Sequence, residues 1–382
     1  MIQGRHNIAE KTSQRRVFVG MSGGVDSSVS AALLKQAGYD VTGVFLKVWQ
    51  PVFLTCNWKE ERLDAMRVAA MLDIPFLTID LEKEYKEEVV DYMIGEYRRG
   101  RTPNPDVMCN KEIKFGAFLK KALSMGADAV ATGHYAQNVF NPVSLTWANT
   151  EGMYEMRESV DTDKDQTYFL WTLTQSQLSK VLFPIGHLPK PEVRKLAQKF
   201  GLPTAEKKDS QGLCFIGKVD MKDFLSHYIA PKQGAVLDEK GKVIGTHDGA
   251  TFFTLGQRHG FIITEKTVAD RPMYVSVKDV EANTITVSAR EVSDADTPLT
   301  TSVLTIGGVS WTGQAPENGS KCEARIRYRQ PLEQCVLLAE TGKNGQYQLR
   351  FAVPQFAASA GQSVVLYRDG VCLGGGIIEL AV

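Results

Sequence analysis

The segment 22–28, SGGVDSS, has the residue types of a phosphate-binding loop. Its two adjacent glycines allow a tight turn and let an anion come close to main-chain N–H groups. Ser27 and Ser28 stand where a helix is expected to begin, and the amides and dipole of a helix N-terminus favour phosphate. The GxxxxGK[ST] pattern of a Walker loop is absent here. The residues alone leave a simpler alternative open, in which Asp26 and Ser27 only cap the helix.

Two of the six cysteines occupy settings in which a thiol can act as a nucleophile. Cys109 follows a loop that prolines hold extended, with Asp106 before it and Lys111 after it. If a helix starts near this point, its N-terminus and the nearby cation favour the thiolate. Cys214 follows a polar, glycine-containing loop and enters an apolar run. For both cysteines a buried core thiol is the alternative.

The remaining cysteines are interpreted as structural, and none forms a CxxC pair: Cys56, Cys322, Cys335 and Cys372. We therefore expect no metal site built from cysteine. Six thiols in a chain that begins without an apolar signal segment predict a reducing, cytoplasmic setting. No apolar run reaches the roughly 18 residues of a membrane span, so we expect no membrane partner.

Two further segments carry polar or basic residues with an open interpretation. Gly133 and His134 end an apolar strand, where a glycine lets a base or ribose approach the backbone, although His134 also suits a satisfied core histidine. Near the C-terminus, alternation along a strand predicts that Arg325, Arg327 and Arg329 share one face. Such a stripe suits phosphate binding, and equally a solvated face.

The elements that must position these residues change along the chain. From residue 16 to about 201, short apolar strands alternate with helical stretches, which predicts a doubly wound parallel sheet that binds ligands at the carboxyl ends of its strands. After Pro231 short strands punctuated by Gly, Asn and Asp predict small barrels, with a boundary near 291–301. A length of 382 residues fits two or three domains. Lys and Arg number 44, as do Asp and Glu, so net charge argues neither for nor against nucleic acid.

Seven motifs occur in order over most of the chain: SGGVDSS, TPNPDVMCNKEIKF, ATGHYA, KDQTYFL, DSQGLCFIG, FTLGQRHG and RIRYRQ. The first resembles the PP-loop of N-type ATP pyrophosphatases, which cleave ATP between the α and β phosphates. Together the motifs, from about Arg16 to the C-terminus, resemble the tRNA-specific 2-thiouridylase family. The resemblance implies an N-terminal PP-loop α/β domain over 1–220, a central β-rich domain over 221–295 and a C-terminal tRNA-binding β-barrel over 296–382.

The resemblance also implies a reaction. ATP, with Mg²⁺, would adenylate the wobble uridine (U34) in the anticodon arm of a tRNA, and a cysteine persulfide would then replace the oxygen at C2 by sulfur. The persulfide would be carried by Cys214 and supplied by a sulfur-relay protein or a cysteine desulfurase. Cys109 would release the sulfur or form a disulfide with Cys214, and Asp106 would act as acid and base or orient the base.

Binding residues are implied in the same way, onto the matching positions of this sequence. Those for ATP are Gly20, Met21, Ser22, Gly23, Gly24, Val25, Asp26, Ser27, Leu46 and Gly133. Those for tRNA are Asn104, Pro105, Asp106, Lys164, Asp165, Gln166, Arg327 and Tyr328. The segment 164–166 is otherwise an ordinary exposed polar turn.

The sequence departs from the family pattern at two places. Leu46 stands where a methionine beside the adenine is expected, and it keeps an apolar contact. The stretch WQPVFLTCNWKEE lacks an expected acidic run. Two other functions stay open on the sequence: an ATP-dependent amidation or ligation, which needs no reactive cysteine pair, and an RNA-binding protein that only senses ATP.

Overall fold

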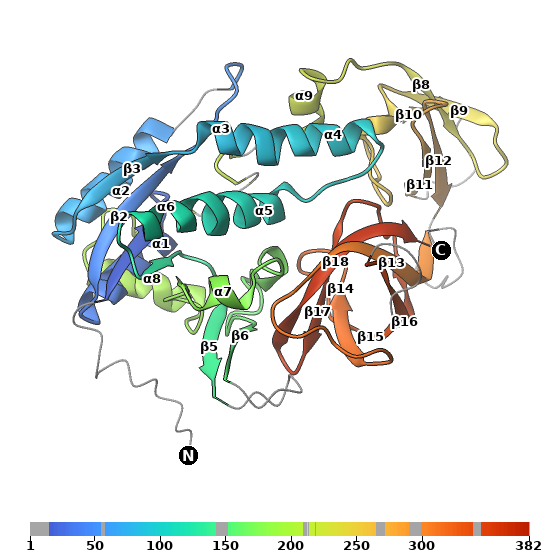
Figure 1. Cartoon of the computed structure of the whole chain (residues 1–382). Coiled ribbons are helices and arrows are strands. Elements are labelled where there is room, and N and C mark those ends of the chain that lie inside the picture. Colours follow the sequence, from blue (N-terminus) through green and yellow to red (C-terminus); the bar gives the residue numbers. More distant parts are fainter. Residues whose placement is uncertain are drawn as a thin grey trace.

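The computed structural model describes residues 15–54, 58–142, 152–208, 212, 214–217, 219–264, 272–289, 299–338 and 345–381. Within them the chain forms an α/β part followed by two β parts, which lie beside one another in Figure 1. Cys56 and the residues 209–211 of the predicted loop before Cys214 lie outside the described residues.

A parallel sheet forms the N-terminal part, with five strands among the described residues. In spatial order they are β3 (Phe76–Asp80), β2 (Asp40–Lys47), β1 (Arg16–Gly20), β4 (Ala129–Ala131) and β7 (Val181–Leu182). The chain runs outward from β1 to β3 and then returns to the other side of β1, so the direction of winding reverses between β1 and β4. Ligands of such sheets bind at the carboxyl ends of the strands at this reversal. The predicted doubly wound sheet is confirmed.

Helices cover both faces of this sheet. Along β1, Val17 and Val19 enter one apolar cluster and Phe18 enters another, as alternation along a strand requires. The cluster around Val17 and Val19 includes residues of α1 (Val25–Gln36), α2 (Trp58–Met71) and α8 (Lys190–Lys199). The cluster around Phe18 includes residues of two long helices.

Each long helix contains a π-helical middle. The first consists of α3 (Glu82–Tyr85), η1 (Lys86–Asp91) and α4 (Tyr92–Arg98), and the second of α5 (Pro105–Met108), η2 (Cys109–Ala117) and α6 (Phe118–Ser124). They lie side by side and run from the parallel sheet toward the β parts (Figure 1). Shorter elements of the structure are α7 (Gln175–Leu178), α9 (Met221–Ser226) and the 3₁₀ turns η3 (Thr167–Phe169) and η4 (Ala250–Phe252).

The central β part is a small sheet with an apolar core of its own. Its strand order is β10 (Phe261–Ile263), β9 (Val243–His247), β8 (Gly234–Leu237), β12 (Thr284–Ala289) and β11 (Met273–Asp279). Core positions alternate along the strands, with Val275 in β11 and Ile285 and Val287 in β12 fully buried.

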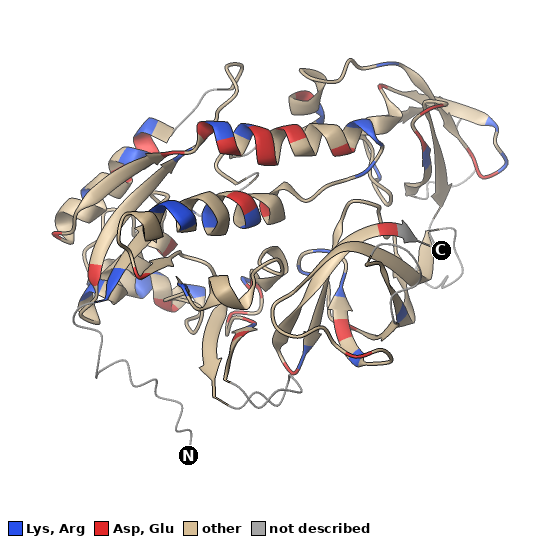
Figure 2. Cartoon of the chain, in the orientation of Figure 1, with Lys and Arg blue, Asp and Glu red and all other residues tan. Residues whose placement is uncertain are grey.

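The C-terminal part is a closed barrel, because β13 pairs with both β16 and β18. Around the barrel the order is β13 (Thr300–Trp311), β16 (Tyr347–Phe356), β15 (Glu333–Leu338), β14 (Lys321–Arg325), β17 (Ser363–Arg368) and β18 (Val371–Ala381). The predicted β-barrel is confirmed. Figure 2 shows basic and acidic residues interspersed along the long helices and over the barrel, as the zero net charge suggests.

A hairpin from the N-terminal half extends the barrel sheet. The strands β5 (Gln137–Asn141) and β6 (Met153–Arg157) pair with each other, and Arg157 of β6 pairs with Val371 of β18. The sequence predicted only a parallel sheet over 16–201, and this hairpin is therefore a difference. Its partner strand lies about two hundred residues further along the chain, which local patterning does not show.

Candidate active site

The glycine-rich segment turns sharply between β1 and α1, at the reversal of the sheet. Gly23 has a φ of +73°, and a Cβ at this position would collide with the carbonyl oxygen of Glu61. Gly24 is the N-cap of α1 and offers no side-chain cap, so the first-turn amides face the loop without one. The amide of Ser22 donates to Oγ of Ser27 over 3.2 Å, which closes the loop on itself. This geometry fits an anion such as a phosphate group.

Two side chains hold the carboxylate of Asp26 inside this loop. The hydroxyl of Tyr135 donates to Asp26 Oδ1 over 2.8 Å, and Nζ of Lys190 lies 2.7 and 2.9 Å from the two carboxylate oxygens. Lys190 is buried at the start of α8. The sequence predicted neither Tyr135 nor Lys190 as a partner of Asp26. Both residues lie more than a hundred positions further along the chain and reach Asp26 only when the sheet folds.

Gly133 and Leu46 lie in two different parts of this site. A Cβ on Gly133 would stand 2.6 Å from the amide nitrogen of Ser27, so only glycine allows the end of β4 to approach the loop this closely. Leu46 of β2 is buried in the apolar cluster around Phe18. The amide of Met21 donates to the carbonyl of Val44 over 2.7 Å, which ties the start of the loop to β2.

The structure brings Cys109 and Cys214 into contact although they are about a hundred residues apart. Both side chains pack in the apolar cluster around Phe18, where Cys109 is fully buried and Cys214 is partly exposed. Asp106 Oδ1 accepts a hydrogen bond of 3.1 Å from the main-chain amide of Cys214. The three residues that the resemblance implied as catalytic are thus one cluster.

Local sequence explains how Asp106 and Cys109 reach this place. Asn104 is the N-cap of α5, and its Oδ1 accepts from the amides of Asp106 and Val107 at 3.2 and 3.3 Å. Pro105 occupies the first helical position, where a missing N–H does no harm. Asn104 and Pro105, which were expected to contact tRNA, therefore build the helix start that carries Asp106 and Cys109.

The segment around Cys214 is held by its backbone. Tyr85 donates its hydroxyl proton to the carbonyl of Cys214 over 2.7 Å, and Nε2 of Gln50 donates to the carbonyl of Phe215 over 2.8 Å. Phe215 has a φ of +66°, a left-handed conformation that is strained for a side chain with a Cβ. Strain of this kind, of order 1–3 kcal/mol, persists where surrounding contacts impose it and is concentrated at functional sites.

The two thiols differ in their acidity. The hydrogen bond from Cys109 and the positive charge of Lys114 lower the pKa of Cys214 to about 7. Burial, together with the hydrogen bond to Cys214, raises the pKa of Cys109 well above its usual range. The thiolate therefore forms more readily on Cys214 than on Cys109. Burial also raises the pKa of Asp106, which suits a carboxyl group that exchanges protons.

His134 connects the cysteine cluster to the glycine-rich loop. It is buried, its Nδ1 lies 2.7 Å from Oγ1 of Thr132, and its Nε2 lies 3.4 Å from Nζ of Lys114. Burial and the charge of Lys114 lower the pKa of His134 well below its usual range, so the ring is neutral. Its neighbour Gly133 touches the loop, so the two halves of the site meet at the end of β4.

The segment 164–166 is not the exposed turn that its polar residues suggest, because Lys164 and Gln166 are only partly exposed. Asp165 is buried, where it accepts from the amide of Ser159 at 2.9 Å and from Oγ1 of Thr167 at 2.7 Å. Gln166 Oε1 accepts from the amide of Tyr135 at 2.9 Å. Two of the three residues thus serve to fix the turn.

The predicted arginine stripe is wrong as a shared face. Strand β14 ends at Arg325, whose guanidinium turns inward to Glu158 at 2.5 Å, and Arg329 has a φ of +64°. Arg327 is partly buried and donates to the carbonyls of Leu255 and Ala357 at 3.0 and 2.9 Å. Tyr328 packs on Phe169, with ring centroids 4.5 Å apart. A turn has replaced the expected strand, so alternation does not apply.

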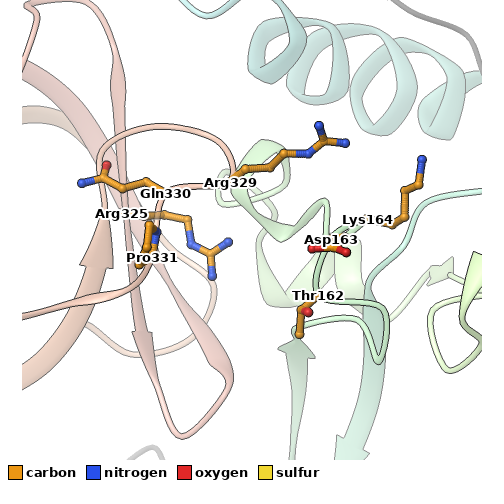
Figure 3. Close-up of a pocket in the computed structure, with 7 residues that line it drawn as sticks. All are labelled: Thr162, Asp163, Lys164, Arg325, Arg329, Gln330 and Pro331. Atoms are coloured by element: carbon orange, nitrogen blue, oxygen red, sulfur yellow. The ribbon is translucent and has the colours of Figure 1, made fainter.

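A cleft of about 610 Å³ opens between this turn and the segment before Asp165. In Figure 3, Arg329 and Lys164 extend into the opening from opposite sides, above Asp163. The cleft is lined by Thr162, Asp163, Lys164, Arg325, Arg329, Gln330 and Pro331. Cationic side chains on both walls of an open cleft suit a phosphodiester chain.

No group of three or more His, Cys, Asp or Glu side chains in the described part of the chain is arranged to hold a metal ion. None of the helices built from the described residues is both long and apolar enough to cross a membrane.

Three family models match consecutive parts of the chain. Residues 15–218 match the tRNA methyl transferase HUP domain, residues 222–289 the tRNA methyl transferase PRC-barrel domain, and residues 301–378 the aminomethyltransferase beta-barrel domain.

Curated relatives match almost the whole chain. The tRNA-specific 2-thiouridylase MnmA of Streptococcus thermophilus is 46% identical over 97% of this chain and 96% of the relative. The enzyme of the same name from Geobacillus thermodenitrificans is 46% identical over 96% of this chain and 95% of the relative. Solved structures are more distant: the U34-tRNA thiolase NcsA from Methanococcus maripaludis, with its [4Fe-4S] cluster, is 16% identical with a TM-score of 0.36, covering 58% of this chain and 67% of that chain.

Proposed function

The chain belongs to the tRNA-specific 2-thiouridylase family, and from this premise we propose how its residues divide the reaction. The enzyme is a tRNA 2-thiouridylase. The target is the wobble uridine, U34, and the steps are ATP-dependent adenylation of the uracil followed by sulfur transfer from a cysteine persulfide. The observation that carries this proposal is the contact between Cys109, Cys214 and Asp106 beside the glycine-rich loop.

The first step uses the loop between β1 and α1. The uracil O2 is a poor leaving group, so it attacks the α-phosphate of ATP and pyrophosphate departs. The segment 20–27 holds the phosphates through its main-chain amides, and Gly133 leaves room for the nucleotide beside Ser27. Leu46 contributes an apolar wall toward the adenine side. Mg²⁺ bound with ATP would neutralise phosphate oxygens, and the carboxylate of Asp26 would be the oxygen ligand that this loop supplies to it.

The second step uses the cysteine cluster. The terminal sulfur of a Cys214 persulfide attacks C2 of the adenylated uracil, and AMP departs. Cys109 then attacks Sγ of Cys214, which frees the thiocarbonyl and leaves a Cys109–Cys214 disulfide for an external thiol to reduce. In the alternative order Cys109 attacks first and releases hydrosulfide, which makes the same disulfide. Asp106, with its raised pKa, moves the proton at the base.

The substrate tRNA is proposed to lie across the cleft between the α/β part and the barrel. Lys164 and Arg329 face the phosphodiester chain of the anticodon arm, while Asp165, Gln166, Arg327 and Tyr328 shape the walls. The donor is a persulfide carried by a sulfur-relay protein or a cysteine desulfurase. Because tRNA and these donors occur in the cytoplasm, we propose that the enzyme works there. Domain limits of 1–220, 221–295 and 296–382 remain proposals.

Incubation of the full chain with ATP, unmodified tRNA and a persulfide donor, followed by nucleoside analysis, tests this function. We expect 2-thiouridine to form together with one pyrophosphate per modified base. Pyrophosphate release without 2-thiouridine, insensitive to thiol alkylation, would instead support an amidation or ligation. Absence of pyrophosphate release with tRNA present would leave only an RNA-binding protein.

A further inference from the structure

Lys114 lies at the centre of the cysteine cluster, in a place that the two proposed steps leave unused. It belongs to the π-helical segment η2, five residues after Cys109. Hydrogen bonds in a π-helix join residues five apart, and in η2 the amide of Phe118 donates to the carbonyl of Ile113. This wider turn puts Lys114 on the same face as Cys109. Insertions of π-helix are rare and are found frequently at functional sites.

The contacts of Lys114 are with the reacting groups. Its Nζ lies 3.4 Å from Nε2 of His134 and 5.6 Å from the ring centre of Phe215, the residue next to Cys214, and its positive charge lowers the pKa of Cys214. The neutral His134 accepts a hydrogen bond from Lys114 through Nε2 if its Nδ1 donates to Thr132. The ammonium therefore lies beside Phe215, the residue that follows Cys214.

The titratable groups of the described residues that face Lys114 are acidic or neutral. Cys109 and Asp106 face it from the second long helix, Cys214 from its loop and His134 from the end of β4, with Tyr85 of the first long helix behind Cys214. Burial acts to lower the pKa of Lys114, but the negative charge of the Cys214 thiolate outweighs it and leaves the pKa raised. Lys114 therefore stays charged.

We propose that Lys114 is a further catalytic residue, whose ammonium holds the sulfur anion of Cys214 while that sulfur accepts a sulfane sulfur from the donor persulfide. This rests on the proposed function. The Cys214 thiolate attacks the outer sulfur of a donor R–S–SH, a bond forms between these two sulfurs, the S–S bond of the donor breaks, and the donor leaves as R–S⁻. Cys214 then carries –S–SH, whose ionised form keeps the same cationic partner.

The sequence supplies a matched control on the same helix. Lys111 lies three residues before Lys114, is exposed, and pairs with Glu112 over 2.9 Å. Removal of Lys111 deletes one positive charge from the same helix without touching the sulfurs. A general effect of net charge would change the reactivity of Cys214 in variants of both lysines. An effect of direct contact changes it only in variants of Lys114.

The test is the pH dependence of Cys214 alkylation by iodoacetamide, followed on the Cys214 peptide by mass spectrometry in the full chain. We expect a midpoint near pH 7 in the wild type. In Lys114→Met and Lys114→Gln it rises by at least about 1 pH unit, so alkylation at pH 6.5 slows roughly tenfold. Lys114→Arg and Lys111→Met keep the wild-type midpoint. Loading of Cys214 from glutathione persulfide at pH 6.5 slows by the same factor.

An unchanged midpoint in folded Lys114→Met or Lys114→Gln, equal to that of Lys111→Met, overturns the proposal. Two neutral replacements of different polarity are used because one alone could fail to fold. Alkylation needs neither ATP nor tRNA, so it reports on Lys114 even if the chain fails to thiolate tRNA. The opposite result is a wild type that thiolates tRNA while the midpoint of Cys214 alkylation is the same in the Lys114 variants as in the wild type. That result would exclude the role of Lys114 and would still agree with the proposed function.

Discussion

At the scale of single residues, the two thiols are expected to act in sequence. Cys214→Ser keeps tRNA-dependent pyrophosphate release and lowers thiolation at least about a thousandfold, because a hydroxyl carries no sulfane sulfur. Cys109→Ser still loads persulfide on Cys214 and stops after the first turnover. Mass spectrometry of the enzyme after one turnover is the measurement. Cys322→Ser, which removes a buried thiol of the barrel, is the control.

Persulfide found on Cys322 and never on Cys214 would contradict this assignment of roles. The structure favours the pair because Cys109 and Cys214 lie in one cluster with Asp106, so a disulfide requires only that the two sulfurs approach each other. Alkylation of Cys214 is expected to accelerate as pH rises through about 7, since the lowered pKa marks where the thiolate replaces the thiol.

Residue types revealed much of this site, but not all of it. The setting of Cys109, with an expected helix start and Lys111 nearby, predicted a favoured thiolate there, but burial raises the pKa of Cys109 and the lowered pKa belongs to Cys214. The sequence did not indicate Lys114 as a site residue, because residues five apart do not share a face of an α-helix. Only the π-helical turns of η2 place Lys114 on the same face as Cys109. The sequence also did not indicate Lys190 as a site residue, because only tertiary packing brings it to Asp26.

At the scale of elements, the turn from β1 into α1 makes Gly23 the sharpest position to change. Gly23→Ala combines a φ of +73° with a Cβ that collides with the carbonyl of Glu61, so the loop or α2 must move. We expect tRNA-dependent pyrophosphate release to fall at least about a hundredfold, because the amides lose their alignment on the phosphates. Steady-state release of pyrophosphate is the measurement.

Gly38→Ala is the matched control for that element. It lies just after α1, has a φ of +86°, and no atom of the described residues stands within 4 Å of its Cβ. It introduces similar backbone strain without the collision, and we expect nearly normal activity. If both variants lose activity equally, strain in α1 rather than the shape of the loop explains the result.

The elements also show where sequence patterns stop being informative. Strand alternation predicted one face for three arginines, but β14 ends at Arg325 and a turn follows, in which Gln330 Oε1 accepts from the amide of Ile326 at 3.1 Å. A side chain that closes a turn in this way leaves little trace in the polarity pattern. The parallel sheet was predictable because its two central strands, β1 and β4, have continuous apolar cores, with Val17, Phe18 and Val19 in β1 and Ala129, Val130 and Ala131 in β4.

At the scale of the whole molecule, the cleft between the α/β part and the barrel is expected to set the salt dependence of tRNA binding. Replacing Lys164 and Arg329 together by Ala removes a cation from each wall. We expect weaker binding and a slope of log affinity against log salt that is shallower by about 1 for each phosphate that the protein no longer neutralises. Arg350 is exposed on β16, and Arg350→Ala is the control. An equal change in slope in this variant would mean that the net charge of the protein, and not the cleft, sets the salt dependence.

The barrel also holds the segment that leads to Asp106. The amide of Thr102 donates to the carbonyl of Ala360 over 2.8 Å, and Nε2 of Gln362 donates to the carbonyl of Thr102 over 2.8 Å. Between them Gly361 has a φ of +93°. No local pattern predicts this contact, because it joins residues about 260 positions apart. The barrel therefore helps to position the segment that leads to Asp106.

Gly361→Ala tests whether this contact positions the catalytic loop. Its Cβ would stand 2.8 Å from the carbonyl oxygen of Thr102, so the segment before Asp106 must shift, with a destabilisation of about 1–3 kcal/mol beyond the backbone strain. Gly370→Ala in the same barrel is the control. Gly370 has a φ of +73° and no atom of the described chain within 4 Å of its Cβ, so this variant introduces backbone strain without a steric collision.

We expect thermal unfolding to show a lower midpoint for Gly361→Ala than for Gly370→Ala, and thiolation to fall only in Gly361→Ala. Because the displacement acts on Asp106 and not on the ATP loop, pyrophosphate release is expected to fall less than thiolation. Equal thiolation in the two variants would mean that the α/β part orders its own catalytic loop and that the barrel serves only to bind RNA.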